Sequence, residues 1–334
     1  MTGGRRFLAG DIGGTKTLLR LSEEAADNPA GRCLQEARYD STAFDDLAPM
    51  VEAFLAEAGE PAPAGACFGV AGPVQGDDRH QRARLTNLPW QLDSDHLAQA
   101  TGIGRVRLVN DFQAVGYGVE ALEAGDLAPL QGGTATPEAP RLVLGAGTGL
   151  GVGLLFWQGD HYEAYPSEAG HLDFAATDER QVRLWRFLAR HYGRVSYERV
   201  VSGPGLAGIY RFLLEEDAQP GEADPVLGAA DPAAAVSERA LTAGETRANA
   251  ALDLFCQVYG AVAGNLALAC LADGGVYIAG GIAPRILPRL QAGGFLRAFT
   301  DKGRMGRLLE AMPVHVITQP KVGLLGAAAA AGRL

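Results

Sequence analysis

The chain has 334 residues, of which 47% are hydrophobic and 20% are charged, and its formal net charge at pH 7 is −10. This length predicts two domains, because a single hydrophobic core stops growing in chains well shorter than this one. The acidic balance and the lack of a basic block argue against a nucleic-acid-binding surface. The 45 glycines are roughly double the usual share and cluster in short runs, which indicates turns and not disorder.

The chain carries little that points to secretion, a membrane or a metal. We expect reduced thiols in a cytoplasmic protein and no cysteine metal site, because no C-x-x-C pair occurs. The first predicted strand begins almost at Met1, so we expect neither a signal segment nor an N-terminal DNA-binding module. The most apolar segment, 258–271, is interrupted by glycine and asparagine and is too short for a membrane span. The cysteines are scattered at Cys33, Cys67, Cys256 and Cys270.

Residues 8–20 are an apolar run, an Asp-Ile-Gly-Gly-Thr turn and a second apolar run, which predicts two strands joined by a glycine turn. Gly13 and Gly14 can adopt positive φ, and without Cβ atoms they let a phosphate approach the backbone. Successive N–H groups in such a turn form an anion-binding concavity. Asp11 is placed to hold a water of hydrated Mg²⁺, an ion that uses few protein ligands. The alternative is a plain hairpin with a polar turn.

The chain then alternates between predicted strands and helices. Thr42 and Ser94 are the expected N-caps of the first two helices. The last strand of this half presents Asn110 and Asp111 at its carboxyl end. The elements are a strand at 33–39, a helix at 44–58, a strand at 66–74, a turn-rich loop at 85–90, a helix at 94–102 and a strand at 105–109.

A second glycine-rich hairpin opens the other half of the chain. The strand at 142–144 runs into a Gly/Thr turn at 145–153, and a further strand follows to Phe156. This is the order of segment 8–20 again, so we interpret it as an internal repeat. Alternating strands and helices indicate the α/β class. The later elements are an amphipathic helix at 181–191, an exposed connection at 217–235, a long helix at 247–271, strands at 276–279 and 314–317, and a closing helix at 322–331.

Together the two hairpins and the strand before Gly280 and Gly281 provide three places where backbone N–H groups could meet a nucleotide. In a two-lobed protein, each lobe would then present a phosphate loop to a shared cleft. The sequence has no Walker-type loop. It also has neither a protein-kinase catalytic loop nor a Rossmann turn leading into a helix.

Six motifs from 8 to 329 resemble the bacterial glucokinase family. The resemblance implies the two-domain actin-like ATPase (ribonuclease H-like) fold of sugar kinases, with an interdomain cleft. It implies a small α/β domain of 1–111 plus 319–334, closed by the C-terminal helix, and a large α/β domain of 112–318. The motifs are Gly-Asp-Ile-Gly-Gly-Thr at 10–15, Leu-Val-Asn-Asp-Phe at 108–112, the glycine run at 145–153, Ser-Glu-Ala-Gly-His at 167–171, Glu-Arg-Val-Val-Ser-Gly-Pro-Gly at 198–205 and Ala-Gly-Gly-Ile at 279–282.

The resemblance also implies the roles of individual residues. Asp111 corresponds to the base that takes the proton from the sugar 6-hydroxyl, and Asn110 and Asp111 contact sugar hydroxyls. Glu168, His171 and Glu198 complete the sugar site. The expected nucleotide contacts are Gly10, Asp11, Ile12, Gly13, Gly14 and Thr15 in the first phosphate loop, Gly145, Gly147, Thr148 and Gly149 in the second, and Gly280 and Gly281 near the adenosine.

These residue types suit the chemistry on their own account. Carboxylates and carboxamides bind hydroxyls and reject analogues that lack them. Phosphoryl transfer has a loose transition state, so an ordinary aspartate within hydrogen-bond reach can serve as base. Glu168 and His171, three residues apart, can face one way on a helical turn. The structural alternatives are Asp111 as an N-cap, Glu168 with His171 as an ion pair or half a metal site, Glu198 as a surface charge, and Asp11 and Thr148 as turn residues.

The resemblance therefore implies a cytoplasmic glucokinase that transfers phosphate from ATP, with Mg²⁺, to the 6-hydroxyl of D-glucose. It implies a homodimer without nucleic-acid or membrane partners. Two alternatives stay open: a kinase of another hexose or N-acetylhexosamine, and a catalytically silent sugar-sensing regulator.

One position departs from the pattern. Gly-Gly-Thr followed by Lys16 is similar to the related ROK sugar kinases and repressors, so Lys16 either approaches the phosphates or lies on the surface. The cysteine-rich zinc motif of that group is missing. We therefore expect the zinc-free glucokinase family.

Overall fold

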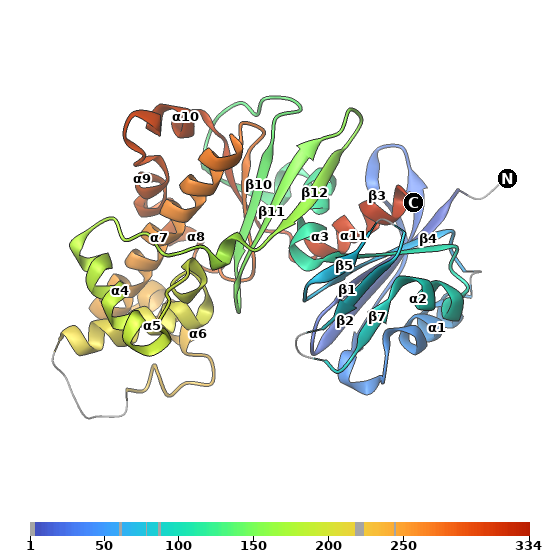
Figure 1. The fold of residues 1–334 in the computed structure, drawn as a ribbon, viewed down its shortest axis with the longest axis horizontal. Coiled ribbons are helices and arrows are strands. Elements are labelled where there is room, and N and C mark those ends of the chain that lie inside the picture. The colour runs from blue at the N-terminus through green and yellow to red at the C-terminus, as the bar shows by residue number, and fades with distance from the viewer. Residues whose placement is uncertain (1–3, 60–61, 78, 86–87, 218–223, 244) are drawn as a thin grey trace. The chain divides into compact units, whose positions relative to one another are not determined.

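A computed structural model of the chain describes residues 4–59, 62–77, 79–85, 88–217, 224–243 and 245–334. The chain divides into two compact units, each with its own sheet and helices (Figure 1). Unit 1 comprises Met1–Asp126, His161–Pro166 and Gln319–Leu334, and unit 2 comprises Leu127–Asp160 and Ser167–Thr318. The fold is mixed α/β, as the sequence predicts.

Among the described residues, unit 1 is built on a five-stranded sheet of order β3-β2-β1-β4-β8. β1 and β2 form the predicted antiparallel hairpin, and β4 and β8 run parallel to β1. The register aligns Ile12, Val70 and Asn110, so the turns after three parallel strands meet at one edge of the sheet. The strands are β1 (Arg6–Ile12), β2 (Lys16–Ala25), β3 (Asn28–Asp40), β4 (Gly65–Val70) and β8 (Arg105–Asn110).

The C-terminal helix α11 (Val322–Gly332) completes unit 1 and packs against β1, β4 and α3 (Asp111–Gly118). The two helices cross closely, because glycines stand at the contact. A Cβ atom on Gly326 would lie 1.8 Å from the Ala114 carbonyl oxygen, and one on Gly118 would lie 2.2 Å from that of Val322. This helix belongs to unit 1, although it follows the whole of unit 2 in the sequence. Unit 1 also contains α1 (Leu47–Ala58), α2 (Ser94–Thr101) and the short strands β5 (Val74–Gly76), β6 (Gln81–Arg84) and β7 (Gln91–Asp93).

The division of the chain differs from the one expected at residue 111. It falls after Asp126, and the segment His161–Pro166 also belongs to unit 1. The reason is that α3 is held from both sides within this unit. It packs on α11, and Nε2 of Gln113 donates to the carbonyl oxygen of Ala164 at 2.7 Å.

In unit 2, five strands follow the order β11-β10-β13-β14-β9. β10 and β11 form an antiparallel hairpin, and β13 and β14 run parallel to β10. This repeats the arrangement of β1, β2, β4 and β8, so the predicted internal repeat is confirmed. The strands are β9 (Leu127–Gln131), β10 (Arg141–Ala146), β11 (Leu150–Trp157), β13 (Val276–Ala279) and β14 (Val314–Ile317), while β12 (Tyr162–Ser167) runs across the division.

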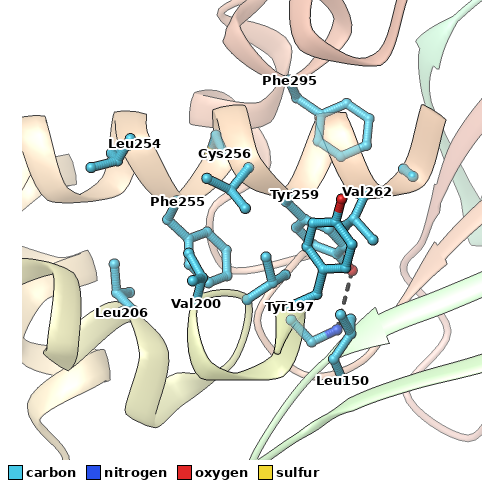
Figure 2. Packing of buried hydrophobic residues seen from close by; sticks show 14 of the residues in the cluster. Leu150, Tyr197, Val200, Leu206, Leu254, Phe255, Cys256, Tyr259, Val262 and Phe295 are labelled. Carbon is cyan, nitrogen blue, oxygen red and sulfur yellow. Dashed lines mark hydrogen bonds between the residues drawn. The ribbon is translucent and has the colours of Figure 1, made fainter. Parts of the chain in front are cut away.

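The long helix α7 (Thr246–Cys270) forms the centre of the unit 2 core. Figure 2 shows Phe255 on this helix pointing toward Val200, while the Tyr259 hydroxyl accepts from the Ala146 N–H at 3.1 Å. By length and composition α7 could cross a membrane, but 78% of its most apolar stretch is buried within the protein. The other helices are α4 (Glu179–Tyr192), α5 (Gly203–Glu216), α6 (Pro232–Glu238), α8 (Leu287–Gln291), α9 (Gly294–Thr300) and α10 (Gly306–Ala311).

Two predicted helix caps are wrong. Thr42 lies in a 3₁₀ turn, and the carboxylate of Asp46 caps α1 instead by accepting from the Leu47 N–H. Asp93 caps α2, while the hydroxyl of Ser94 accepts from the N–H of Gln81. In both helices a carboxylate just before the first turn satisfies its free N–H groups.

The connection expected over 217–235 is also shorter than predicted. Residues 218–223 lie outside the described residues, as do Thr86 and Asn87 of the loop at 85–90. Helix α6 begins at Pro232, after Asp231 as its N-cap, and a π-helical turn at Arg239–Ala243 continues it. Pro232 and the alanines that follow it therefore belong to a helix start and not to a loop.

Candidate active site

Two acidic side chains lie at the carboxyl edge of the unit 1 sheet. Asp11 ends β1 with Ile12, and Asp111 opens α3 directly after β8. Oδ1 of Asn110 and Oδ1 of Asp111 each accept from the Phe112 N–H at 2.9 Å. Asn110 is the N-cap of α3, and its Nδ2 also donates to the Gly72 carbonyl oxygen at 3.2 Å. The N-cap role weighed for Asp111 therefore falls to its neighbour.

The surroundings of these carboxylates favour their protonated form. Burial raises the pKa of Asp111 to about 6, and the negative charge of Asp11 acts in the same direction. Burial also raises the pKa of Asp11, while the ammonium of Lys16 acts to lower it. Paired carboxylates in a partly buried position suit a hydrated divalent cation, because its charge offsets their repulsion.

The first glycine turn is tight, but not in the way expected. Gly13 and Gly14 are not among the glycines with positive φ. The N–H of Gly13 donates to the Lys16 carbonyl oxygen at 3.0 Å, and a Cβ on Gly13 would lie 2.8 Å from that oxygen. Gly13 is needed for the close approach of two backbone segments. Thr15 and Lys16 are exposed beside it.

Two residues proposed for this loop lie inside β1. Gly10 and Ile12 are buried, and a Cβ on Gly10 would lie 2.6 Å from the Phe68 ring. Gly10 therefore lets the sheet pack closely beneath the turn. Its effect on a bound nucleotide would pass through the turn itself.

The second glycine turn is joined to Glu198. The Gly147 N–H donates to the Gly149 carbonyl oxygen and the Gly203 N–H to that of Gly147, both at 2.8 Å. The Leu150 N–H donates to Oε2 of Glu198 at 3.0 Å. A Cβ on Gly149 would lie 2.4 Å from the same Oε2, so glycine makes room for this carboxylate.

Glu168, His171 and Glu198 come together in unit 2. Nε2 of His171 lies 3.8 Å from Oε2 of Glu168, and its Nδ1 lies 3.9 Å from Oε1 of Glu198. Their exposure differs: the side chains are 79%, 56% and 28% exposed in the order Glu168, His171, Glu198. Glu198 is the most restrained, because Tyr197 and Val200 beside it belong to the buried core (Figure 2).

A cavity of about 860 Å³ in unit 2 adjoins the second glycine turn. Three residues predicted to contact nucleotide line it: Gly147, Thr148 and Gly281. Gly145 and Gly280 instead bring strands together, since their Cβ atoms would lie 2.6 Å from Ala279 and 2.4 Å from Ala146. The remaining walls come from the start of α5, from α6 and the turn after it, and from the segment after β13.

Sequence reasoning missed the α6 wall of this cavity. Its lining positions recur at helical spacing, as Asp231, Ala234, Glu238 and Leu241. Small alanines on one face leave a flat apolar surface, as in many nucleotide and drug-sized ligand sites. The spacing was visible in the sequence, but the alanine and proline content indicated a loop. Ile282 and Arg285 complete the opposite side.

The chain was compared with protein families, curated proteins and solved structures. A family model described as Glucokinase matches residues 8–334. The glucokinase of Nostoc punctiforme is 47% identical over 343 residues, covering 98% of this chain and 99% of that protein. The chain belongs to the glucokinase family. It is accordingly an ATP-dependent glucose kinase, and the regulator alternative is set aside.

Solved structures agree with this family fold. The crystal structure of glucokinase from an Antarctic psychrotroph has a TM-score of 0.87 and 30% identity, covering 98% of this chain and 99% of that one. A ROK family glucokinase from Streptomyces griseus, solved with glucose and AMPPNP, has a TM-score of 0.62 and 21% identity. It covers 98% of this chain and all of that one, and at this identity the likeness is one of fold. Both belong to sugar kinases of the two-domain actin-like ATPase fold.

Proposed function

We propose that Asp111 is the catalytic base that takes the proton of the glucose 6-hydroxyl as it attacks the γ-phosphate of ATP. The main support for this proposal is the position of Asp111 at the turn from β8 into α3, beside the N-cap Asn110. A pKa of about 6 leaves this carboxylate largely ionised at pH 7 yet closer in basicity to its task than an exposed aspartate. Asp111 would position the hydroxyl and accept its proton, because the loose transition state needs no strong nucleophile.

We infer that the sugar is held by hydroxyl contacts from two groups of residues. Asn110 and Asp111 form the first group, and Glu168, His171 and Glu198 form the second. Support comes from the proximity of the last three around His171. Carboxylates paired with several sugar hydroxyls reject sugars in which a hydroxyl is missing or has the opposite configuration, since the protein group is then left unpaired.

The nucleotide is proposed to lie along the two glycine turns, with its adenosine in the 860 Å³ cavity of unit 2. That cavity is large enough for a nucleoside and combines apolar walls with a few polar groups. The turn residues 13–15 and 147–149 would face the phosphates, while Gly10, Asp11, Ile12 and Gly145 support these turns from the ends of β1 and β10. Asp11 would hold Mg²⁺ through a water, and the ion would supply charge neutralisation for the phosphates.

The remaining assignments rest on the family resemblance alone. We propose a cytoplasmic homodimer without nucleic-acid or membrane partners. Reduced cysteines agree with a cytoplasmic location, since all four lie among the described residues and are free.

A steady-state assay across sugars and phosphoryl donors tests the proposed substrates. Formation of the sugar phosphate, the product common to all donors, is followed with glucose, mannose, galactose, N-acetylglucosamine and 2-deoxyglucose, each with ATP, ADP or polyphosphate as donor. We expect glucose with ATP to give the highest kcat/KM by at least about tenfold. A higher value for any N-acetylhexosamine, or for polyphosphate, would overturn the substrate assignment.

A further inference from the structure

Beneath the β8–α3 corner of unit 1 lies a group of interacting side chains that the reaction scheme leaves without a task. Nη2 of Arg107, on β8, pairs with Oε1 of Glu163 at 2.7 Å. The hydroxyl of Tyr117, on α3, donates to the same Oε1 at 2.5 Å. The Arg107 guanidinium also lies 5.6 Å from the centre of the Tyr117 ring. A single carboxylate oxygen therefore joins β8 to α3.

The charges in this group depend on one another. Burial acts to raise the pKa of Glu163, but the hydrogen bonds from Tyr117 and Arg107 outweigh it and hold the pKa below its ordinary value. The side chains of Arg107 and Glu163 are only 18% and 22% exposed. A buried pair of this kind is costly to break, since removing one charge leaves the other without a partner. On its other oxygen, Glu163 lies 3.6 Å from Nε2 of His161.

The two partners of Glu163 flank Asp111 along the chain. Arg107 precedes it on the strand, and Tyr117 follows it on the helix. A second link acts in the same place, because Gln113 of α3 donates to the carbonyl oxygen of Ala164 next to Glu163. The direction in which α3 leaves β8 is thus fixed from the segment His161–Pro166, and that direction sets where the Asp111 carboxylate points.

We propose that Glu163 is a positioning residue for phosphoryl transfer, acting through Arg107 and Tyr117 on the orientation of Asp111. The proposal rests on Asp111 being the base. Glu163 itself has no proposed contact with the sugar or the phosphates, so its effect on the rate would be indirect. Small displacements matter here, because a misplacement of about 1 Å can reduce an enzymatic rate by about 100-fold.

The substitution Glu163→Gln tests this role, since it keeps the size of the side chain but removes the charge that Arg107 needs. We expect kcat to fall by about 30-fold, with KM for ATP within about twofold. Tyr117→Phe removes only the hydroxyl and should show the same pattern at a smaller size, by about fivefold in kcat.

Glu36→Gln is the matched control. Glu36 is a unit 1 glutamate with a 21% exposed side chain and two cationic partners, Arg20 and Lys321, at the β2–β3 side of the sheet. Both variants should lose thermal stability, but only Glu163→Gln should lose kcat. Should Glu163→Gln fail to fold, the Tyr117→Phe result decides.

The outcomes separate this role from the assignment of the base. The positioning role is overturned if Glu163→Gln and Tyr117→Phe keep the kcat of Glu36→Gln while Asp111→Ala is inactive. If Asp111→Ala itself keeps its activity, the base assignment fails first, and the positioning role fails with it.

Discussion

Asp111 and Glu168 are acidic residues with proposed contacts to one sugar, yet their surroundings differ sharply. Asp111 is partly buried where a strand turns into a helix, and neighbouring hydrogen bonds hold that turn. The Glu168 side chain is 79% exposed, and its ion-pair contact is His171 at 3.8 Å. The fold therefore orients the first group before substrate arrives. The second would be oriented by the sugar only on binding, as is common for contacts that tighten in a complex.

The largest effect is expected from a substitution that disturbs the buried packing around Asp111, at the contact of α3 with α11. Gly326→Ala would put a Cβ 1.8 Å from the Ala114 carbonyl oxygen and push α11 away from α3. We expect unit 1 to lose about 3 kcal/mol of stability or more, since backbone cannot move aside as a side chain can. Thermal denaturation measures the loss.

Gly125→Ala is the control for that change, because a Cβ on Gly125 meets nothing within 4 Å and its φ is not positive. It should shift stability by less than about 0.5 kcal/mol. Equal melting temperatures for the two variants would contradict the close α3–α11 contact.

On the exposed side, Gly149→Ala should affect activity and not stability. The new methyl group would meet Oε2 of Glu198 at 2.4 Å and displace the carboxylate from the Leu150 N–H. Because this places both the glycine turn and the sugar contact out of position, kcat/KM for glucose should fall by about 30-fold. Steady-state kinetics and circular dichroism check this, with Gly208→Ala as control, where a Cβ makes only an ordinary contact at 3.6 Å. Unchanged kinetics in Gly149→Ala would show that Glu198 is not held as described.

The pH dependence follows from the buried position of Asp111. With a pKa of about 6, the base is protonated at lower pH, so kcat/KM should fall tenfold for each pH unit well below 6. Folding stability should change in the opposite sense. A carboxyl whose pKa is raised on folding adds stability below about pH 4, and this is lost as pH rises through about 6.

Asp111→Asn isolates this effect. The substitution should remove the contribution of Asp111 to the pH dependence of the free energy of unfolding. It should also stabilise the protein at pH 7 by about 2 kcal/mol, as measured by urea unfolding at pH 4 and pH 7. An Asp111→Asn variant that is less stable than the wild type at pH 7 would argue against an Asp111 carboxylate that destabilises the fold by being buried.

The smallest effect is expected at the most exposed residue. Glu168→Gln should raise KM for glucose by about fivefold and leave the melting temperature unchanged, because little of this side chain is packed. Isothermal titration of glucose would give the same ratio. A loss of stability similar to that of Gly326→Ala would show that Glu168 is packed as closely as the surroundings of Asp111, which would remove the distinction between the two residues.

The sequence was sufficient to predict the two hairpins, because alternating apolar residues around Gly/Thr turns have few other uses. It also predicted the carboxyl-end position of Asn110 and Asp111, since β8 leads directly into them. The helix caps were missed by one or a few residues. Asp46 and Asp93 are as suitable as N-caps as Thr42 and Ser94, and spacing alone does not decide between them.

Other features depend on contacts between distant segments. No local pattern places Glu163 beside Arg107 and Tyr117, because the three come from separate elements. The same holds for the packing of α3 on α11, which moves the division of the chain beyond residue 111. The α6 wall of the cavity was hidden by alanine and proline, whose helical use depends on the cap at Asp231.

The central claim is that Asp111 acts as a base that the fold has already oriented. The most direct measurement compares Asp111→Ala with the wild type in both turnover and glucose binding. We expect turnover to fall by at least about 1,000-fold, while the Kd for glucose stays within about threefold because the other sugar contacts remain. Turnover within about tenfold of the wild type would contradict the claim.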